Sequence, residues 1–327
     1  MCNVKRLLIK IVLLVLLVLL LVCTVFLMPV PYSDNLSAII NKRDLLKDGH
    51  CDRIVFIGGS GLFDGLDSNL VEVRLGRPVV NMGLYYGFGI TPLLHEIMPY
   101  LHPGDTVVII PEYGVAFDAP DEPARKWIFA LDPALNWVLY RDVPDRVRSF
   151  VTDVIFLVQS KLRAFPKAVL EAVRMRSLTP LTRQGYAYYD KYYNAYGDSL
   201  RTMRAEPGAP PLRSSDIVAT PAYNQPFTKV SSFCRDALQK GVETFFIFPA
   251  FPEEEYLRQE EEMLRYETRL RKELQCTVLG APQDYLYPLS YFTNAVHHIN
   301  NDARRIRTER LLKDLEHAMA GRTARQF

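Results

Sequence analysis

A serine stands directly after a short apolar run near the start of the chain. Residues 54–57 are Ile-Val-Phe-Ile, and Gly58, Gly59, Ser60 and Gly61 follow them. A short, continuous apolar run predicts a strand that is covered on both faces. Glycines surround the Ser60 hydroxyl with little steric bulk, so a substrate can reach it. Ser60 is therefore a candidate nucleophile, and a plain strand-to-loop turn is the alternative interpretation.

Further polar residues and glycines follow the predicted strands that come later in the chain. These candidates are Asn81, Gly83, Glu112, Tyr113, His297 and His298. Ligands of open parallel sheets bind outside the carboxyl ends of the strands, so we expect these residues to gather near Ser60. A nucleophile, N–H donors at glycine turns and a histidine base are together the components of an acyl-transfer site.

The elements that must position these residues alternate between strands and helices. Apolar runs predict strands over residues 53–57, 78–81, 106–110, 244–249 and 276–279. Helical patterns lie near residues 68–75, 90–101, 227–240, 253–274 and 300–319. This alternation predicts an α/β fold, with a flavodoxin-like, three-layer arrangement around a parallel sheet of five strands.

One long segment, residues 114–225, interrupts the alternation between the third and fourth strands. A loop of this length without structure is implausible in a compact domain, so an inserted helical cap is predicted. The cap contains an expected helix over residues 145–175, bent or broken at Pro166. Tyrosines are dense over residues 186–196, and they either pack between cap and sheet or stack on sugar rings.

The N-terminal residues predict a membrane anchor. Residues 7–30 form an apolar segment that is long enough to cross a bilayer, with Lys10 as its only charge. No small-residue cleavage site precedes Pro29, so the anchor is expected to remain uncleaved. Lys5 and Arg6 precede the segment and predict an N-terminus in the cytoplasm, with the main domain on the other side.

The chain is thus expected to divide into an anchor over residues 1–30, a polar tether over residues 31–50 and an α/β domain over residues 51–320. A net charge of +2 gives no basic field that would favour nucleic acid. Histidines and cysteines lack metal-ligand spacing, so neither a metal nor a cofactor is predicted. The arginines of the last helix are interpreted as its solvated face. They are Arg304, Arg305, Arg307 and Arg310.

The order of these motifs resembles that of the SGNH (GDSL-type) hydrolase superfamily. The matching features are the turn at Ser60, the "NMG" block at residues 81–83 and the histidine block at residues 297–298. The segments "LHPGDTVVIIPEYG", "YNAYGD" and "HHINNDARRIRTERLLKDL" are similar to bacterial members of its membrane-anchored branch. That branch includes proteins similar to the alginate O-acetyltransferase and lipoteichoic acid D-alanylation proteins. The resemblance covers most of residues 51–320, and it depends on the order of the motifs rather than on any single one.

The resemblance implies roles for individual residues. Ser60 matches the nucleophile, and His298 matches the base because of the residues that follow it. His297 is the alternative base. Either Gly83 or Asn81 matches the position that supplies an oxyanion N–H in the family.

The resemblance also implies an activity and a location. An acyl group would pass through an acyl-serine to water or to a sugar hydroxyl, so the chain would be an esterase or an O-acyltransferase. The implied substrate is an acylated polysaccharide or cell-wall polymer, and a membrane-bound O-acyltransferase is an implied partner. The implied location is the bacterial cytoplasmic membrane, with a single membrane-spanning segment and an extracytoplasmic main domain.

Two departures from the pattern of the family support an alternative. Asn294 replaces the aspartate that precedes the histidine, and Glu112 and Tyr113 stand where the third block has an asparagine. An asparagine cannot stabilise an imidazolium by charge, and the corresponding Asp-to-Asn change in serine proteases lowers turnover about 10⁴-fold. Glu112 is either a replacement acid or the partner of an arginine. The alternative is a catalytically degenerate SGNH fold that binds a polymer or a partner protein in envelope assembly.

Overall fold

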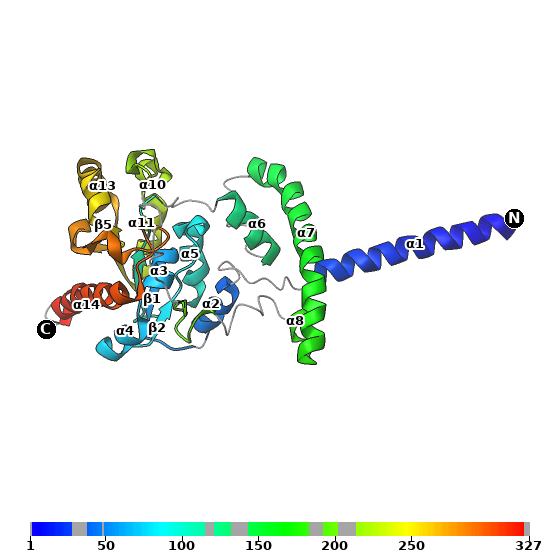
Figure 1. Cartoon of the computed structure of the whole chain (residues 1–327), viewed down its shortest axis with the longest axis horizontal. Helices are drawn as coiled ribbons and strands as arrows, with labels where there is room; N and C mark the ends of the chain where they lie inside the picture. The colour runs from blue at the N-terminus through cyan, green and yellow to red at the C-terminus, as the bar shows by residue number, and fades with distance from the viewer. Residues whose placement is uncertain are drawn as a thin grey trace.

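A parallel sheet of five strands forms the centre of the molecule (Figure 1). The structure is a computed structural model, and it describes residues 2–27, 38–47, 49–114, 121–131, 143–182, 192–201 and 214–323. The strands are β1 (Ile54–Gly58), β2 (Val79–Asn81), β3 (Thr106–Ile110), β4 (Glu243–Ile247) and β6 (Thr277–Leu279). Their order is β2-β1-β3-β4-β6, which is the strand order of flavodoxin-like doubly wound sheets. The predicted α/β class and the five-stranded parallel sheet are confirmed.

The register of the sheet determines which residues meet at its carboxyl edge. Every residue of β1 and of β3 is buried, as expected for central strands covered on both faces. The two strands are parallel neighbours, and Gly58 pairs with Ile110. Ser60 and Glu112 each lie two residues beyond this pair. The register therefore brings the predicted nucleophile next to a carboxyl group.

Helices cover both faces of the sheet. In Figure 1, α2 and α5 lie on one side of the strands and α14 lies on the other. The helices of this α/β body are α2 (Ala38–Lys47), α3 (Ser60–Gly65), α4 (Ser68–Leu75), α5 (Ile90–Ile97), α10 (Pro221–Asn224), α11 (Thr228–Gln239), α12 (Glu253–Leu257), α13 (Glu260–Glu273) and α14 (Asn301–Thr323). A second, small parallel sheet pairs β5 (Phe251–Pro252) with β7 (Leu286–Tyr287).

Two segments differ from the sequence expectation. Residues 38–47, which were assigned to a polar tether, form α2, in which Ala38, Ile39 and Leu46 are fully buried. The tether assignment fails there because charged residues interrupt the apolar ones, and one of these charged residues, Lys42, is itself buried. The helix predicted over residues 253–274 is divided into α12 and α13 at Gln259, whose side-chain oxygen accepts the N–H of Ile217 at 2.7 Å.

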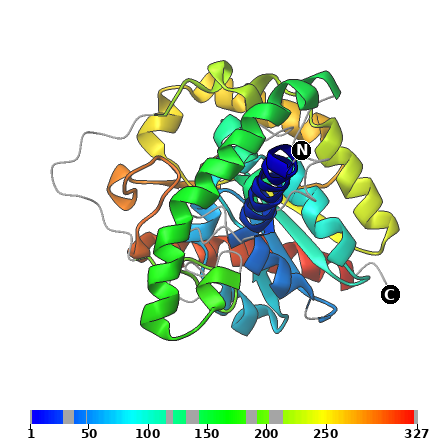
Figure 2. The same ribbon diagram turned by 90° about the vertical axis from the view of Figure 1, so that its right-hand side faces the viewer.

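The described part of the insertion is helical. It contains α6 (Glu122–Leu131), α7 (Val143–Met175) and α8 (Thr179–Thr182). The helix predicted over residues 145–175 is confirmed, and α7 continues through Pro166 without a break. Figure 2 shows α7 lying across the face of the body from which α1 (Cys2–Leu27) projects. The tyrosine-rich segment is described only from Tyr192 onward.

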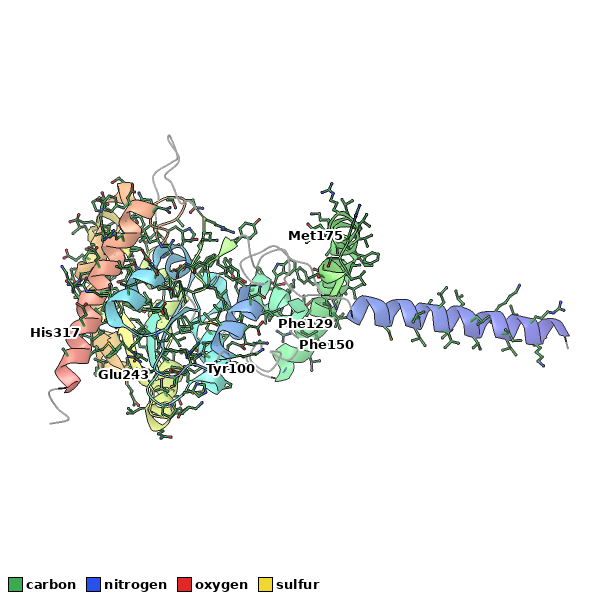
Figure 3. The ribbon with its side chains drawn as sticks, turned by 90° about the horizontal axis from the view of Figure 1, so that it is seen from below. Tyr100, Phe129, Phe150, Met175, Glu243 and His317 are labelled. Carbon is green, nitrogen blue, oxygen red and sulfur yellow. The ribbon has the colours of Figure 1, made fainter. Side chains whose placement is uncertain are left out.

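Aromatic and charged side chains join α6 to α7. The rings of Phe129 and Phe150 lie 6.2 Å apart, edge to face (Figure 3). Arg125 forms a buried ion pair with Asp153. Because α6 also packs against the turn at Tyr86–Phe88, the long helix is connected through α6 to the α/β body.

No helix in the described part of the chain has the length and apolar character that a membrane crossing requires.

The amino edge of the sheet contains a buried ion pair whose loss we expect to destabilise the fold. Asp105 is 0% exposed, pairs with the Arg53 guanidinium at 3.1 Å and accepts the N–H groups of Arg53 and His102, each at 2.9 Å. Asp105→Ala leaves a buried charge unpaired, so the free energy of unfolding should fall by about 3–5 kcal/mol.

Urea denaturation of the two variants Asp105→Ala and Asp44→Ala tests this expectation. Asp44 pairs with Lys47 at 2.9 Å on the surface, where both side chains are more than half exposed. Its loss should change the free energy of unfolding by less than about 1 kcal/mol. Equal losses in the two variants would contradict a structural role for the buried pair.

Candidate active site

Ser60 is the first residue of α3, the short helix that follows β1. Close packing requires the two glycines before it. A Cβ on Gly58 would lie 2.4 Å from the Ile110 carbonyl oxygen, and a Cβ on Gly59 would lie 2.7 Å from the Glu112 carboxyl. The chain thus leaves the strand in tight contact with the end of β3, and Ser60 is only 6% exposed. A helix, rather than an open turn, follows the strand.

The Ser60 hydroxyl forms a hydrogen bond with His298. Ser60 Oγ donates to His298 Nε2 at 2.7 Å, and His298 Nδ1 donates to Asn294 Oδ1 at 2.8 Å. The amide oxygen can only accept, so Nδ1 holds the proton and Nε2 keeps its lone pair for the serine. Three residues singled out from the sequence are therefore joined in one chain of hydrogen bonds.

A tight loop holds His298 in this position. The His298 N–H donates to the Ala295 carbonyl at 3.1 Å, and the His298 carbonyl accepts the Thr293 N–H at 2.9 Å. An antiparallel bridge between Phe292 and Ile299 closes the loop. The backbone of the loop, rather than side-chain packing alone, sets the direction of the imidazole.

The other histidine, His297, packs against an aromatic ring instead of Ser60. Its ring centre lies 5.6 Å from that of Phe251. The pKa of His297 is lowered to about 3, chiefly by burial and also by the neighbouring His298, against a hydrogen bond with the Tyr113 backbone. Of the two candidate bases, the geometry favours His298.

His298 is held neutral at ordinary pH. Burial lowers its pKa below the usual value, the negative charge of Asp64 opposes this, and the positive charge of Arg201 lowers the pKa again. A neutral imidazole can accept the serine proton, whereas an imidazolium cannot. The imidazole is thus in its proton-accepting form near neutral pH, and its charged form is poorly stabilised.

Glu112 contacts both the serine and the start of α3. Its Oε1 accepts the Gly61 N–H and lies 3.2 Å from Ser60 Oγ. Glu112 is 5% exposed, and its pKa is raised to about 7, chiefly by burial, against the contacts with the Gly61 N–H and the Ser60 hydroxyl. The nearby Asp64 contributes to the raised pKa, while Arg307 opposes it. The carboxyl is therefore poised between its neutral and ionised forms near neutral pH.

Asn81 and Gly83, which the sequence assigned to the oxyanion position, do not line the cavity at Ser60. The Gly83 N–H donates to Asn81 Oδ1 at 2.8 Å, and Asn81 Nδ2 donates to Asp198 Oδ1 at 2.8 Å. Lys42 Nζ, which is fully buried, donates to the Gly83 carbonyl. Their polar groups are thus satisfied within the protein, and the oxyanion assignment of both residues is corrected.

Asp198 is the residue of this site region that sequence reasoning missed. It accepts the Ser68 N–H at 2.9 Å and pairs with Arg304 at 3.3 Å. Arg307, which is 2% exposed, donates to the Gly65 carbonyl at the end of α3 at 2.8 Å. The sequence pattern predicts that the arginines of the last helix form its solvated face, and this interpretation is wrong for Arg304 and Arg307. The only signal for Asp198 was its place in the "YNAYGD" segment.

A cavity of about 520 Å³ opens beside Ser60, Glu112, Asn294 and His298. Tyr113 lines it as well, with its ring edge-to-face with Phe251 at 5.0 Å. The remaining wall is rich in aromatic, hydroxyl and amide side chains with one arginine, and includes Tyr85, Tyr86, Arg201, Ser214, Ser215, Thr220 and Gln259. Such a lining suits a polar ligand with flat apolar faces.

Comparisons with known proteins leave this geometry as the main guide to function. No protein-family model matches the chain, and a search of curated proteins returns no match. Within the described residues, no cluster of three or more His, Cys, Asp or Glu side chains is arranged to hold a metal ion.

The buried carboxyl of Glu112 predicts a pH-dependent stability. Its pKa is raised from 4.5 to about 7 in the folded state, so between these values the folded protein binds more protons than the unfolded chain. The free energy of unfolding of the wild type should therefore fall as pH rises through this window. Glu112→Gln lacks this titration and should gain stability relative to wild type across the window, by about 2–3 kcal/mol.

Urea denaturation at several pH values between about 5 and 7.5 measures this difference. Glu254→Gln, which removes an exposed carboxylate from the first turn of α12, is the control for the loss of one charge. A stability difference between Glu112→Gln and wild type that stays constant with pH would rule out titration of Glu112.

Proposed function

We propose that this chain is an SGNH-type serine acyl esterase or O-acyltransferase. The observation that supports it most is the pair of hydrogen bonds from Ser60 to His298 at 2.7 Å and from His298 to Asn294 at 2.8 Å. A serine next to a neutral imidazole whose far nitrogen is oriented by a third side chain is the arrangement that activates a hydroxyl nucleophile. The adjoining cavity gives an acyl substrate access to Ser60.

The proposed reaction begins with attack by Ser60. His298 Nε2 takes the hydroxyl proton as Oγ bonds to the acyl carbon, and a tetrahedral oxyanion forms. Collapse of the intermediate expels the donor alcohol, which takes the proton from His298. Water or a sugar hydroxyl then attacks the acyl-serine by the reverse steps, and the nature of this acceptor distinguishes an esterase from a transferase.

Asn294 and Glu112 determine how fast this site can work. Asn294 orients His298 but offers it only an amide dipole. The protonated form of His298 is therefore stabilised less than it would be by a carboxylate. An ionised Glu112 would oppose an oxyanion near the Gly61 N–H. In its neutral form, which the raised pKa favours below about 7, Glu112 can instead donate a hydrogen bond to that oxyanion.

The proposed substrate is an acylated polysaccharide or cell-wall polymer. Aromatic rings of the cavity, such as Tyr85 and Tyr86, can stack on sugar rings, and the exposed hydroxyl of Ser215 can bind a sugar hydroxyl. A membrane-bound O-acyltransferase that delivers the acyl group is a proposed partner. No nucleic acid is expected, because the net charge is +2.

The proposed location is the bacterial cytoplasmic membrane, with residues 7–30 as the anchor and the main domain outside the cytoplasm. This segment extends beyond the described part of α1, and its apolar composition after Lys5 and Arg6 supports the proposal. The exported polymers named above are substrates that an extracytoplasmic domain can reach.

A binding protein without turnover is the second candidate. It is favoured by one observation: the Glu112 carboxyl accepts the Gly61 N–H and contacts the Ser60 hydroxyl. A carboxylate in that position opposes oxyanion formation, and Asn81 and Gly83 are engaged elsewhere. In this case the cavity would hold a polymer or a partner protein without reaction.

Hydrolysis of p-nitrophenyl acetate by the full chain and its variants separates the two candidates. Ser60→Ala and His298→Ala should abolish hydrolysis, while His297→Ala, the same change at the adjacent histidine, should retain most of it. Asn294→Asp should raise the rate about 10-fold to 10³-fold, which corresponds to about 1.4–4 kcal/mol of barrier, because a carboxylate stabilises the imidazolium.

The double variant Asn294→Asp with Ser60→Ala measures the background, and circular dichroism checks that each variant is folded. If folded Asn294→Asp is no faster than this double variant, the acyl-serine proposal is wrong and the binding candidate remains. A loss in His297→Ala with full activity in His298→Ala would reverse the choice of base.

A further inference from the structure

The long helix α7 exposes a continuous stripe of large apolar side chains. These residues are Val147, Val151, Ile155, Leu162, Phe165, Val169 and Val173, and each is between 37% and 70% exposed. They follow one another at intervals of 3, 4 or 7 residues, so they lie along one side of the helix. A different set, including Asp153, Leu157, Ala168 and Ala172, is buried against the rest of the protein. The exposed stripe is thus additional to the packing face.

The apolar stripe is longer than the apolar surfaces that soluble proteins usually expose to water. A helix of 33 residues extends about 50 Å at 1.5 Å per residue. Soluble proteins seldom leave an apolar surface of this extent uncovered, and such surfaces mark sites of interaction. Near its carboxyl end the stripe reaches an apolar groove of about 290 Å³, which is lined by Val169, Val173, Leu178 and Leu181 with Arg176 beside them.

Every charged side chain of α7 that the structure describes as exposed is positive. These side chains are Arg148, Arg163, Lys167 and Arg174. Glu171 is half-buried, and Asp153 is buried in its ion pair with Arg125. By their helical positions Arg148 borders the apolar stripe, and Arg163, Lys167 and Arg174 lie on the adjoining face, between Arg148 and the buried side of the helix. An apolar stripe with Lys and Arg on the adjoining face matches a lipid surface with anionic headgroups.

The orientation of α7 relative to α1 supports the same partner. Figure 1 and Figure 2 show α1 projecting away from the body and α7 lying across the face from which it projects, and the two helices are in contact. The large apolar side chains of α1 from Val4 to Leu20 are also exposed. If residues 7–30 are the membrane anchor proposed above, the bilayer around them meets α7 along its length.

We propose that α7 is an interfacial helix that binds the surface of a phospholipid bilayer containing anionic lipids. The apolar stripe enters the boundary between headgroups and acyl chains, and the four cations contact the anionic headgroups. The groove beside Leu178 continues the apolar surface that acyl chains contact. This inference is independent of the acyl-transfer chemistry proposed above.

A second copy of this chain fits the surface less well. Self-association through the stripe would bring the cations Arg148, Arg163, Lys167 and Arg174 of two copies toward one another. Like charges at such an interface disfavour the contact, whereas anionic headgroups favour it. The lipid surface is therefore the occupant that the charge pattern selects.

Photo-cross-linking of the full chain in lipid vesicles tests the proposal. A diazirine-bearing amino acid replaces Leu162 on α7 or, as the matched control, Leu257 on α12. These leucines are 56% and 58% exposed, and α12 packs against β5 and α13, which Figure 1 shows on the side of the body away from α7. The vesicles contain phosphatidylethanolamine and phosphatidylglycerol, and mass spectrometry identifies each adduct.

The proposal predicts a phospholipid adduct at Leu162 with a yield at least several times that at Leu257. The double change Arg163→Glu and Lys167→Glu should lower the yield in these vesicles more than in vesicles of phosphatidylcholine alone. Equal lipid yields at the two leucines, or an adduct at Leu162 with a second copy of the chain, would overturn it. Vesicle flotation distinguishes failure of α7 from failure of the N-terminal anchor, because an anchored chain floats even if α7 does not contact lipid.

Discussion

The parallel pairing of β1 with β3 is the constraint on which the candidate site depends. Because Gly58 lies opposite Ile110, the chain that leaves β1 and the chain that leaves β3 run side by side, and Ser60 and Glu112 come into contact. Glycine fits positions 58 and 59 because a Cβ at position 58 would lie 2.4 Å from the Ile110 carbonyl oxygen, and a Cβ at position 59 would lie 2.7 Å from the Glu112 carboxyl. The loop from Thr293 to Ile299 brings the His298 imidazole to 2.7 Å from the Ser60 hydroxyl.

Buried charge behind this edge connects the site to the rest of the fold. Asp198 joins Asn81 to Arg304, so a residue from the insertion ties the end of β2 to α14. Lys42 of α2 lies among Asp198 and Asp64, and its burial lowers its pKa to about 7. These groups surround the turn at Ser60 without lining its cavity. They hold the turn in place, and the charge of Asp64 acts to raise the pKa of both His298 and Glu112.

The sequence predicted most of the sheet and the proximity of Ser60 to His298, because both follow from local patterns. Apolar runs locate the strands, and the rule for the carboxyl edge brings Ser60 and His298 together. The roles of Asn81 and Gly83 were not predictable, because their hydrogen bonds depend on Asp198 and Lys42 from distant segments. Helix α2 was missed because a buried lysine gave its sequence a polar appearance. The sequence could not decide between His298 and His297, because the direction of each imidazole depends on the backbone conformation of the loop from Thr293 to Ile299.

The central claim is that His298 activates Ser60 as a nucleophile, and the reaction of the full chain with a fluorophosphonate tests it most directly. The serine oxygen displaces fluoride from phosphorus, and mass spectrometry of the peptides locates the modified residue. The account predicts modification of Ser60 in the wild type and in His297→Ala, and its loss in His298→Ala. An unmodified Ser60 in the wild type, or equal modification in His298→Ala, would contradict it.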